Sequence, residues 1–583
     1  MQRNTAVLSG TSLRKGGIVP DPDSFDDDQY RFLRWIAIRS TLVFVASYLV
    51  LFSVMSLRPN VYDEGLVLTA AMRVAAGQIP HRDFYVNYGP AQFYVLAGLF
   101  NTFGTSILVE RLFDVFIKAL LVAAVYAIAS FYCRMSIAVA ACGVAFLWVF
   151  GVMNETSGAA MTPVSLLNLV GSALILPVFR SAVSTRRMLA AGAIAGTATL
   201  FRYDTGIALL GIQAFVMVIA IFTRLRGLST RMRATCSALG PYLLGFVLLT
   251  LPPLVYYLSV APLHPLIHDI FLYPMKYYHR SRNIPFPPIS WAEFDQSAIY
   301  TTIVIILVSL CVAAFLFRTR RDSVRSSPTT VEPQSYYGLL ITFGLLAFGM
   351  YFKGFVRVQL IHLFLSIIPA SLLLAILVEH RSSLPRAVRI FVACLACLFV
   401  ASSIWSARLE VRHLRSQTCF LAQLVKREIL HRKSPEILRE WCKTTNPLTK
   451  GVCFLCDEGH IRTIDFIGAH TVPGQKLFVG LTRHDTIIKN DNIIYFAAQR
   501  LPATKWSHFD PDLQNRSDVQ AEIVHELDVS TPPYIVRDSE FDSIWEPNDS
   551  SRSSGVTLLD DYLQNKYQHI DTFGTMTLWQ RQQ

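Results

Sequence analysis

Two adjacent carboxylates, Asp63 and Glu64, stand directly after the first long apolar segment of the chain. A short amphipathic stretch follows them, stops at Gly77, and leads into an aromatic loop that runs to Pro90. Carboxylates at a bilayer surface are costly to hold unless they are paired or take part in chemistry. The doublet is therefore the first candidate for proton transfer or ligand binding. The alternative is that both acids cap a helix that begins near Gly65, which the helix dipole would favour.

The elements that must position these acids are membrane helices. The chain has 583 residues, of which 52% are hydrophobic and only 16% charged, whereas soluble proteins carry roughly a quarter charged residues. Apolar runs of about 20 residues, enough to cross ~30 Å of hydrocarbon, recur along the first two thirds. A polar N-terminus precedes the first run, so we expect no removable signal peptide. The pattern predicts about eleven spans, at 36–57, 107–131, 136–153, 163–179, 188–201, 206–222, 236–258, 297–317, 336–352, 359–378 and 388–405.

Arginines in short loops predict the orientation, because such loops favour the cytoplasm. With the spans above, the arginine-rich loops all fall on one side, and the 61–90 loop falls on the other. The net charge of +12 is then largely a consequence of topology, and scattered arginines argue against a nucleic-acid partner. We expect a multi-pass protein of the plasma (inner) membrane with an extracytoplasmic (periplasmic) 61–90 loop. The arginines concerned are Arg31, Arg34, Arg39, Arg180, Arg186, Arg187, Arg224, Arg226, Arg231, Arg233, Arg318, Arg320, Arg321, Arg325, Arg381, Arg386 and Arg389.

The predicted fold class is a polytopic α-helical membrane protein with a C-terminal soluble α/β domain. Residues 1–35 form a cytoplasmic polar segment, 36–405 the transmembrane domain and 406–583 the extracytoplasmic domain. Apolar segments at 476–479 and 492–496 predict buried strands, and 517–527 predicts a helix.

Four cysteines lie beyond the spans, and on an extracytoplasmic side they favour one or two disulfides over half of a zinc site. They are Cys419, Cys442, Cys453 and Cys456.

Several charged residues outside the doublet are further candidates. Lys353, Arg357 and His362 flank a short turn on the side that normally lacks basic residues; they suit an anion, or else they snorkel to lipid headgroups. Glu155 lies in the next loop on the side of the doublet and is equally compatible with a plain surface acid. Arg111 shares a helix face with Asp114 and Lys118, which favours a structural charge ladder.

A long loop between the predicted spans at 236–258 and 297–317 combines aromatic and basic side chains. His268, Tyr277 and Arg280 represent this mixture. Such a combination suits a sugar face and a lipid phosphate, and it equally suits an interfacial aromatic belt.

The stretch from Tyr62 to Arg111 resembles the first extracytoplasmic loop of GT-C glycosyltransferases, which include protein O-mannosyltransferases and bacterial aminoarabinose and galacturonosyl transferases. The combination is specific, although each part alone is weak, and the remaining spans agree in layout more than in motif. The matching elements are Asp63-Glu64, Arg73, Gly77, Pro80, Asp83-Phe84, Tyr88-Gly89-Pro90 and Phe103-Gly104 leading to Arg111.

This resemblance implies an inverting transferase that moves a sugar from a polyprenyl-phosphate donor to an extracytoplasmic lipid, glycan or protein acceptor. Such a reaction needs a base for the acceptor hydroxyl and positive charge for the departing phosphate. The motif makes Asp63 the base and Glu64 the runner-up, or a group that orients the loop. It makes Glu155 a second acid, with a divalent metal ion as a possible cofactor.

The donor phosphate is assigned by the same resemblance to Lys353, Arg357 and His362, with help from Arg111. Relatives place an acid where Gln359 stands, which weakens this transfer of roles. The remaining candidates for the loop and substrate pocket are Asp83, Tyr85, Tyr88, His268, Tyr277 and Arg280.

The chief rival is a transporter or flippase for a lipid-linked or anionic substrate. Transporters bury charges at mid-bilayer and show paired halves with broken helices. Here the informative charges gather at one surface and no repeat is visible, which favours the enzyme. A third possibility is a catalytically silent scaffold for envelope assembly.

Overall fold

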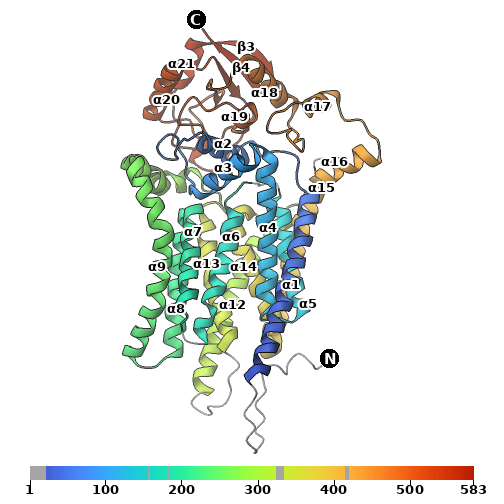
Figure 1. Ribbon diagram of the computed structural model, residues 1–583, viewed down its shortest axis with the longest axis vertical. Helices are drawn as coiled ribbons and strands as arrows, with labels where there is room; N and C mark the ends of the chain where they lie inside the picture. Colours follow the sequence, from blue (N-terminus) through green and yellow to red (C-terminus); the bar gives the residue numbers. More distant parts are fainter. Residues whose placement is uncertain (1–21, 155–157, 181–182, 324–333, 414–418, 583) are drawn as a thin grey trace, which may run out of the picture.

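The computed structural model describes residues 22–154, 158–180, 183–323, 334–413 and 419–582. Long helices form an upright bundle, and a smaller mixed region sits at one end of it (Figure 1). Ten helices of the described ranges are long and apolar enough to cross a membrane. The chain is therefore a multi-pass membrane protein with the predicted fold class.

The long helices follow the predicted spans closely, and each of the eleven predicted spans coincides with a helix. One of them, α7, has 17 residues and is shorter than the ten that cross by length. The bundle consists of α1 (Pro22–Ser53), α4 (Ile107–Ser130), α5 (Met135–Met153), α6 (Met161–Ile175) with the 3-10 turn η2 (Leu176–Phe179), α7 (Thr185–Phe201), α8 (Tyr203–Arg224), α9 (Leu228–Val260), α12 (Ser297–Ser323), α13 (Gln334–Lys353), α14 (Leu360–Glu379) and α15 (Arg386–His413).

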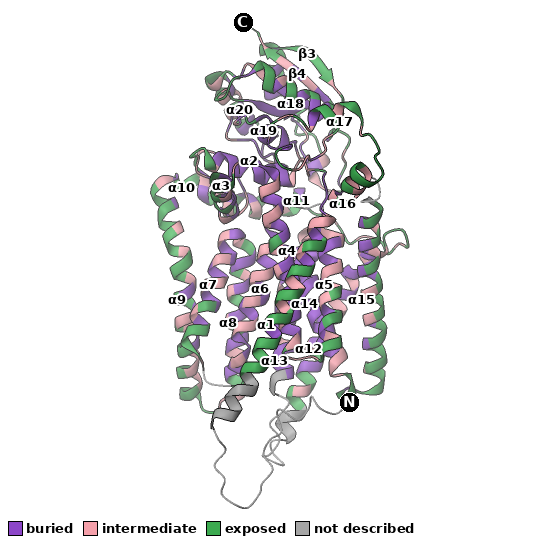
Figure 2. Ribbon diagram, turned by 45° about the vertical axis from the view of Figure 1, so that its right-hand side comes forward, coloured by how far each residue is buried: buried purple, intermediate pink, exposed green. Residues whose placement is uncertain are grey.

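Burial separates the centre of the bundle from its periphery. Over an apolar stretch of 18 residues in each helix, 83% of the residues are buried in α14, against 11% in α9 and 17% in α1. Exposed residues predominate along α1, α9 and α15 (Figure 2), and many of them are large and apolar. A helix with an apolar exposed face needs lipid around it, so α14 forms the core and α1, α9 and α15 face the bilayer.

Short elements lie at one end of the bundle, which we call the cap side. It carries α2 (Asp63–Ala75) and α3 (Ala91–Phe103) between α1 and α4, and the segment 263–296 between α9 and α12 (Figures 1 and 2). That segment contains α10 (Leu263–Ile267), the π-helical turns η3 (His268–Leu272) and η4 (Pro274–Tyr278), α11 (His279–Ser281) and the 3-10 turn η5 (Phe294–Gln296). The predicted amphipathic helix after the acidic doublet is thus confirmed as α2, and Gly77 follows it with a φ of 85°.

Residues 419–582 complete the cap side and are called the C-terminal region. They contain a four-stranded sheet of order β1-β2-β4-β3, with β1 (Phe478–Leu481) parallel to β2 (Tyr534–Asp538), and β4 (Met576–Arg581) antiparallel to both β2 and β3 (Tyr567–Phe573). The helices of this region are α16 (Phe420–Leu424), the π turn η9 (Val425–Ile429), α17 (Glu436–Trp441), α18 (Glu458–His470), α19 (Ile493–Ala498), α20 (Ser517–Ser530), the 3-10 turn η10 (Asp549–Ser551) and α21 (Leu558–Lys566).

The secondary structure expected for the C-terminal region is partly confirmed. The helix predicted at 517–527 is α20, and the strand predicted at 476–479 overlaps β1. The strand predicted at 492–496 is wrong, because this segment forms the short helix α19, buried at every position. A short run that is apolar on all sides has no periodicity that separates a buried strand from a buried helix.

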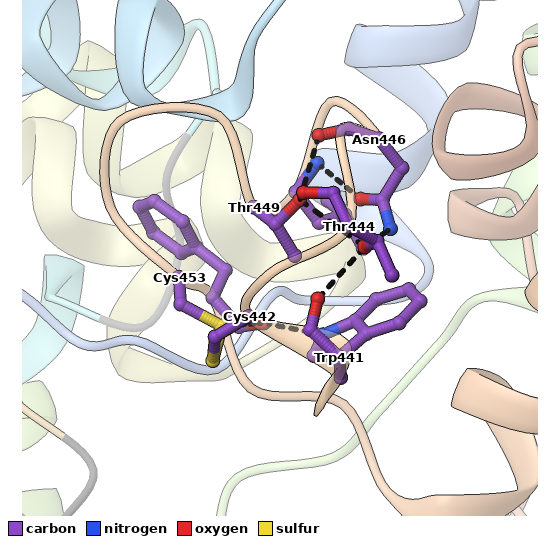
Figure 3. The surroundings of a disulfide bond; sticks show 8 residues. Trp441, Cys442, Thr444, Asn446, Thr449 and Cys453 are labelled. Atoms are coloured by element: carbon purple, nitrogen blue, oxygen red, sulfur yellow. Dashed lines mark hydrogen bonds between the residues drawn. A yellow bond between two sulfur atoms is a disulfide. The ribbon is translucent and has the colours of Figure 1, made fainter. Parts of the chain in front are cut away.

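One disulfide joins Cys442 to Cys453 (Figure 3). It closes a loop held by local hydrogen bonds, such as that from the Thr449 hydroxyl to the Thr444 carbonyl at 2.6 Å. Of the one or two disulfides predicted, one is present, while Cys419 and Cys456 are free thiols. The same loop contacts the N-terminus of α4, since Ile107 donates its backbone N–H to the Pro447 carbonyl.

Candidate functional site

Asp63 opens α2 on the cap side, and its carboxylate is left open. The side chain of Asn60 accepts the backbone N–H of Asp63 at 2.9 Å and that of Tyr62 at 3.1 Å, so the helix starts without using the Asp63 carboxylate. Within the ranges that the structure describes, the Asp63 carboxylate makes no hydrogen bond and no ion pair, although the residue is half-buried.

Charged groups surround Asp63 at longer range. Burial raises the pKa of Asp63, and the positive charges of Lys489, Arg282 and Arg357 oppose that rise. A carboxylate with a raised pKa and no hydrogen-bonded partner is a stronger proton acceptor than an ordinary surface aspartate.

Glu64 occupies the opposite environment. Its carboxylate is fully buried, accepts two bonds from the Arg111 guanidinium at 2.6 and 2.8 Å, and also accepts the backbone N–H of Asn60 at 2.9 Å. Adjacent helical residues do not face the same way, so Asp63 faces the cations around it and Glu64 faces α4. The charged cluster denotes Asp63, Lys489, Arg282 and Arg357.

These contacts correct two expectations. Neither Glu64 nor Arg111 is free for the catalytic and phosphate-binding roles expected from the sequence, because each satisfies the other inside the protein. Glu110, which the sequence did not single out, lies 3.8 Å from the same arginine. The predicted charge ladder holds further down α4, where Lys118 and Asp114 are 2.5 Å apart.

Basic side chains gather beside Asp63, at the cap-side ends of α7, α13 and α14. Arg357 makes two hydrogen bonds to Glu546, at 2.9 and 2.5 Å. Lys353 lies 3.0 Å from Asp204, and Arg202 lies 3.3 Å from the same carboxylate. Asp204 is therefore shared by two cations.

His362, at the start of α14, interacts electrostatically with Arg357, Lys353 and Arg202. The sequence-predicted cations at positions 353 and 357 and this histidine are therefore brought together.

Arg282 completes this group, and the sequence analysis did not select it. Its guanidinium donates to Asp510 at 2.5 Å, to the Tyr62 hydroxyl at 3.2 Å and to the Ile488 carbonyl at 3.0 Å. Arg280, the arginine chosen from this loop, is exposed at the surface instead. Composition alone could not separate two arginines that are two positions apart, because their faces depend on a short irregular helix.

Aromatic and polar side chains of the first loop and of the C-terminal region lie beside Arg282. His508 stacks on Tyr88 with ring centroids 6.2 Å apart, and the Tyr85 hydroxyl donates to Asp510 at 2.9 Å. Burial lowers the pKa of His508, which favours the neutral ring. Although burial opposes it, the charge and hydrogen bond of Arg282 and the hydrogen bond from Tyr85 hold the pKa of Asp510 below its usual range. Tyr85 and Tyr88 therefore lie at the site, as expected, against residues that the sequence did not indicate.

Two of the remaining loop candidates line a cavity of about 750 Å³. They are His268 and Tyr277, and Tyr85, which donates to Asp510, lines it as well. His268 contacts Asp269 at 3.2 Å. Asp83 accepts the Ile79 backbone N–H at 2.7 Å and so stabilises its own turn.

A metal site is not assembled in the ranges described. They contain no group of three or more histidine, cysteine, aspartate or glutamate side chains arranged to hold an ion. Glu64 cannot act as a free second carboxylate, since Arg111 and Asn60 occupy its oxygens. Glu155 lies outside the described residues.

Two solved structures share this architecture. ArnT from Cupriavidus metallidurans bound to undecaprenyl phosphate matches with a TM-score of 0.51 at 15% identity, over 92% of this chain and 97% of that one. The apo state of the same protein gives 0.53 at 14% identity, over 93% and 98%. An oligosaccharyltransferase from Archaeoglobus fulgidus, in complex with Zn and sulfate, gives a TM-score of 0.46 at 10% identity, over 94% of this chain and 73% of that one.

No protein-family model matches the chain, and no curated protein sequence matches it. The likeness to ArnT extends over nearly the whole length of both chains, and at this identity it concerns the fold. The chain therefore shares the overall fold of ArnT.

Proposed function

We propose that this chain is an integral-membrane, inverting glycosyltransferase that moves a sugar from a polyprenyl-phosphate donor to an acceptor hydroxyl. The observation that carries the proposal is the open carboxylate of Asp63, raised in pKa and facing Arg357, Arg282 and Lys489. A proton acceptor opposite a group of cations is what transfer from a sugar phosphate requires. The fold shared with ArnT, one structure of which holds undecaprenyl phosphate, supports the choice of donor.

The reaction is a single displacement. Asp63 takes the proton of the acceptor hydroxyl while that oxygen attacks the anomeric carbon of the donor sugar. The bond from this carbon to the phosphate oxygen breaks, and its electron pair leaves with the phosphate. Arg357, Arg282 and Lys353 stabilise the negative charge that the leaving phosphate gains. One displacement inverts the configuration at the anomeric carbon.

The substrates approach from two directions in this proposal. The carrier phosphate sits where His362 and Arg357 meet the cap-side end of the bundle, so that its polyprenyl chain stays in lipid. The acceptor enters through the 750 Å³ cavity, which Tyr85 lines; the same tyrosine donates to Asp510, the partner of Arg282. The aromatic and basic lining of that cavity, with His268 and Tyr277, suits a polar glycan or an anionic headgroup.

We place the cap side outside the cytoplasm. The arginine-rich loops, such as those after α6 and α8, lie at the opposite end of the bundle (Figure 1), and basic loops favour the cytoplasm. The domain division follows: 1–35 cytoplasmic, 36–405 transmembrane, and 406–583 extracytoplasmic. The cap side is then the periplasmic face of an inner membrane.

The test is a donor-consumption assay with purified protein in lipid vesicles and a radiolabelled polyprenyl-phosphate sugar. An enzyme consumes the donor only when an acceptor extract is present, and the label appears on an acceptor. A flippase moves the donor between leaflets without consuming it, and a scaffold does neither. Relocation without consumption, in the presence of acceptor, would overturn the proposal.

A further inference from the structure

Glu546 binds Arg357, the arginine to which the proposed function assigns the donor phosphate. Its two carboxylate oxygens accept from the two terminal nitrogens of Arg357, at 2.9 and 2.5 Å, the paired geometry that an arginine also offers to phosphate. The Glu546 and Arg357 side chains are only 11% and 18% exposed. An anion that uses Arg357 must therefore bind beside this carboxylate or compete with it.

The position of Glu546 is fixed by its own loop. Residues 539–557 connect β2 to α21, and within them Glu546 donates its backbone N–H to the Ser551 hydroxyl at 2.7 Å. The Asn548 side chain donates to Glu546 and to the Asn283 carbonyl, both at 3.0 Å. Residue 284 in turn pairs with Arg357 as an isolated β-bridge. The loop of the C-terminal region is thus anchored to the same segment that positions the arginine.

The charges of the site nearly cancel. Its four cations are Arg202, Arg282, Lys353 and Arg357, and each has a carboxylate partner. Only three carboxylates serve them, because Asp204 is shared by Arg202 and Lys353. The group therefore carries one excess positive charge, and Lys489 and Asp63 beside it offset each other. Without Glu546 the excess would be two.

We propose that Glu546 tunes the phosphate site to a monoanion, so that it retains the sugar-bearing phosphodiester and releases the spent phosphomonoester. This inference rests on the proposed function. A polyprenyl-phosphate sugar is a phosphodiester with one negative charge, whereas the carrier left after transfer is a phosphomonoester. The second ionisation of a phosphomonoester has a pKa near 6, so this product carries close to two charges at neutral pH. A fixed carboxylate repels a dianion more than a monoanion, and Glu546 is a specificity-determining residue in this sense.

The test compares two probes that do not react: a polyprenyl phosphate and its methyl phosphodiester. Their dissociation constants are measured at about pH 7.5, where the monoester is mostly dianionic, with wild-type protein and Glu546→Gln in lipid nanodiscs. The substitution keeps the shape and removes the charge. We expect the affinity for the monoester to rise roughly tenfold or more and that for the diester to rise clearly less. Glu546→Asp, which keeps the charge, should retain the wild-type preference.

Asp549→Asn is the matched control, because it removes the same charge from the same loop, at the exposed ion pair with Arg552. It should leave both dissociation constants unchanged. Equal changes for the two probes in Glu546→Gln, or no change, would overturn the inference. Arg357→Gln separates the two proposals: if it weakens both probes while Glu546→Gln has no selective effect, the phosphate site stands and the role of Glu546 falls. If the wild type binds neither probe, the proposed function fails, and the inference with it.

Discussion

Asp63 and Glu64 share the first turn of α2, yet their surroundings give them different chemistry. Asp63 has no partner among the described residues and lies among cations, while Glu64 is bonded to Arg111 in a buried pair. A base must be able to gain and lose a proton during each turnover. A carboxylate held inside the protein by two arginine hydrogen bonds cannot approach a substrate. The two acids therefore make separate experimental predictions.

Lys489→Met should shift the pH dependence of transfer. Burial raises the pKa of Asp63, and Lys489 is the foremost of the charges that oppose this rise. Removing its charge lets the pKa of Asp63 rise further, so the base becomes protonated at a higher pH. The acid limb of the pH–rate profile should then move to higher pH, measured as initial rates across a pH series. Lys476→Met, at an exposed lysine of the same region, should leave the limb in place, and an unshifted limb in Lys489→Met would contradict the account.

Glu64→Gln should destabilise the protein. The substitution leaves the buried Arg111 guanidinium without its ionised partner, a change that costs on the order of 3 kcal/mol in buried pairs. We expect a clearly lower thermal midpoint in detergent, followed by the fluorescence of a thiol-reactive dye. Glu440→Gln, at an exposed pair with Lys443, should give no measurable shift. If Glu64→Gln keeps its midpoint but loses transfer, Glu64 is catalytic after all.

The site residues that could be predicted from sequence are those that belong to a local motif. Asp63, Tyr88 and Arg357 lie where the pattern suggested, because each stands at the junction of a span and a loop on one side of the membrane. Lys489, Asp510 and Glu546 could not be found in this way. They reach the site from the C-terminal region through long-range packing, and a single sequence contains no periodicity that reports such a contact.

Small residues allow α7 to pack very closely against α9. Gly192 and Gly196 lie one turn apart and face Gly245 of α9, whose backbone comes very close. A Cβ added at Gly192 would meet the Tyr242 carbonyl oxygen at 1.8 Å, and one at Gly245 would meet the Leu189 carbonyl oxygen at 2.0 Å. Small residues spaced by four allow this kind of contact between membrane helices.

Gly192→Ala should therefore lower the thermal midpoint of the purified protein. In a helix interior alanine is normally more favourable than glycine by roughly 0.5–1 kcal/mol, so a loss of stability would come from the contact with α9. Gly240→Ala is the control on α9 itself, since nothing lies within 4 Å of the position a Cβ would take there. It should leave the midpoint unchanged or raise it. A higher midpoint in Gly192→Ala would show that the helices do not pack so closely.

At the scale of elements the spans were predictable and the short segments were not. Long apolar runs leave few alternatives to a helix in lipid, since every backbone polar group must be paired. The segment 492–496 was assigned the wrong structure because it is buried on all sides in contact with α2. There the Asn492 carbonyl accepts the Thr69 hydroxyl at 2.9 Å, and a Cβ at Gly65 would meet the Ile493 nitrogen at 2.6 Å.

The C-terminal region packs against the first loop on the cap side of the bundle. The C-terminal region covers α2, and Arg73 of that helix donates to the Thr504 carbonyl at 3.2 Å and the Ser507 hydroxyl at 3.1 Å. His460 stands between Asp457 and Asp491, which raise its pKa to about 10 despite burial. A protonated His460 thus fixes the segment that leads into α19. The charged cluster around Asp63 therefore contains residues from both the cap side of the bundle and the C-terminal region.

Orientation is testable at this scale with single cysteines in a chain whose free cysteines are replaced. Val529→Cys lies in the C-terminal region and Leu228→Cys at the other end of the bundle, and both native side chains are about equally exposed, at 71% and 70%. We expect an impermeant maleimide to label position 529 in spheroplasts and position 228 only after lysis. The reverse pattern would put Asp63 in the cytoplasm and overturn the proposed localisation.

The most direct test of the central claim is single-turnover sugar transfer by Asp63→Asn, with saturating acceptor and a polyprenyl-phosphate donor in lipid. The account holds that Asp63 removes the acceptor proton while the cations bind the donor. It predicts a rate lower by roughly 10²–10⁴-fold, with the affinity for the methyl phosphodiester probe little changed. Transfer at a nearly normal rate would contradict it.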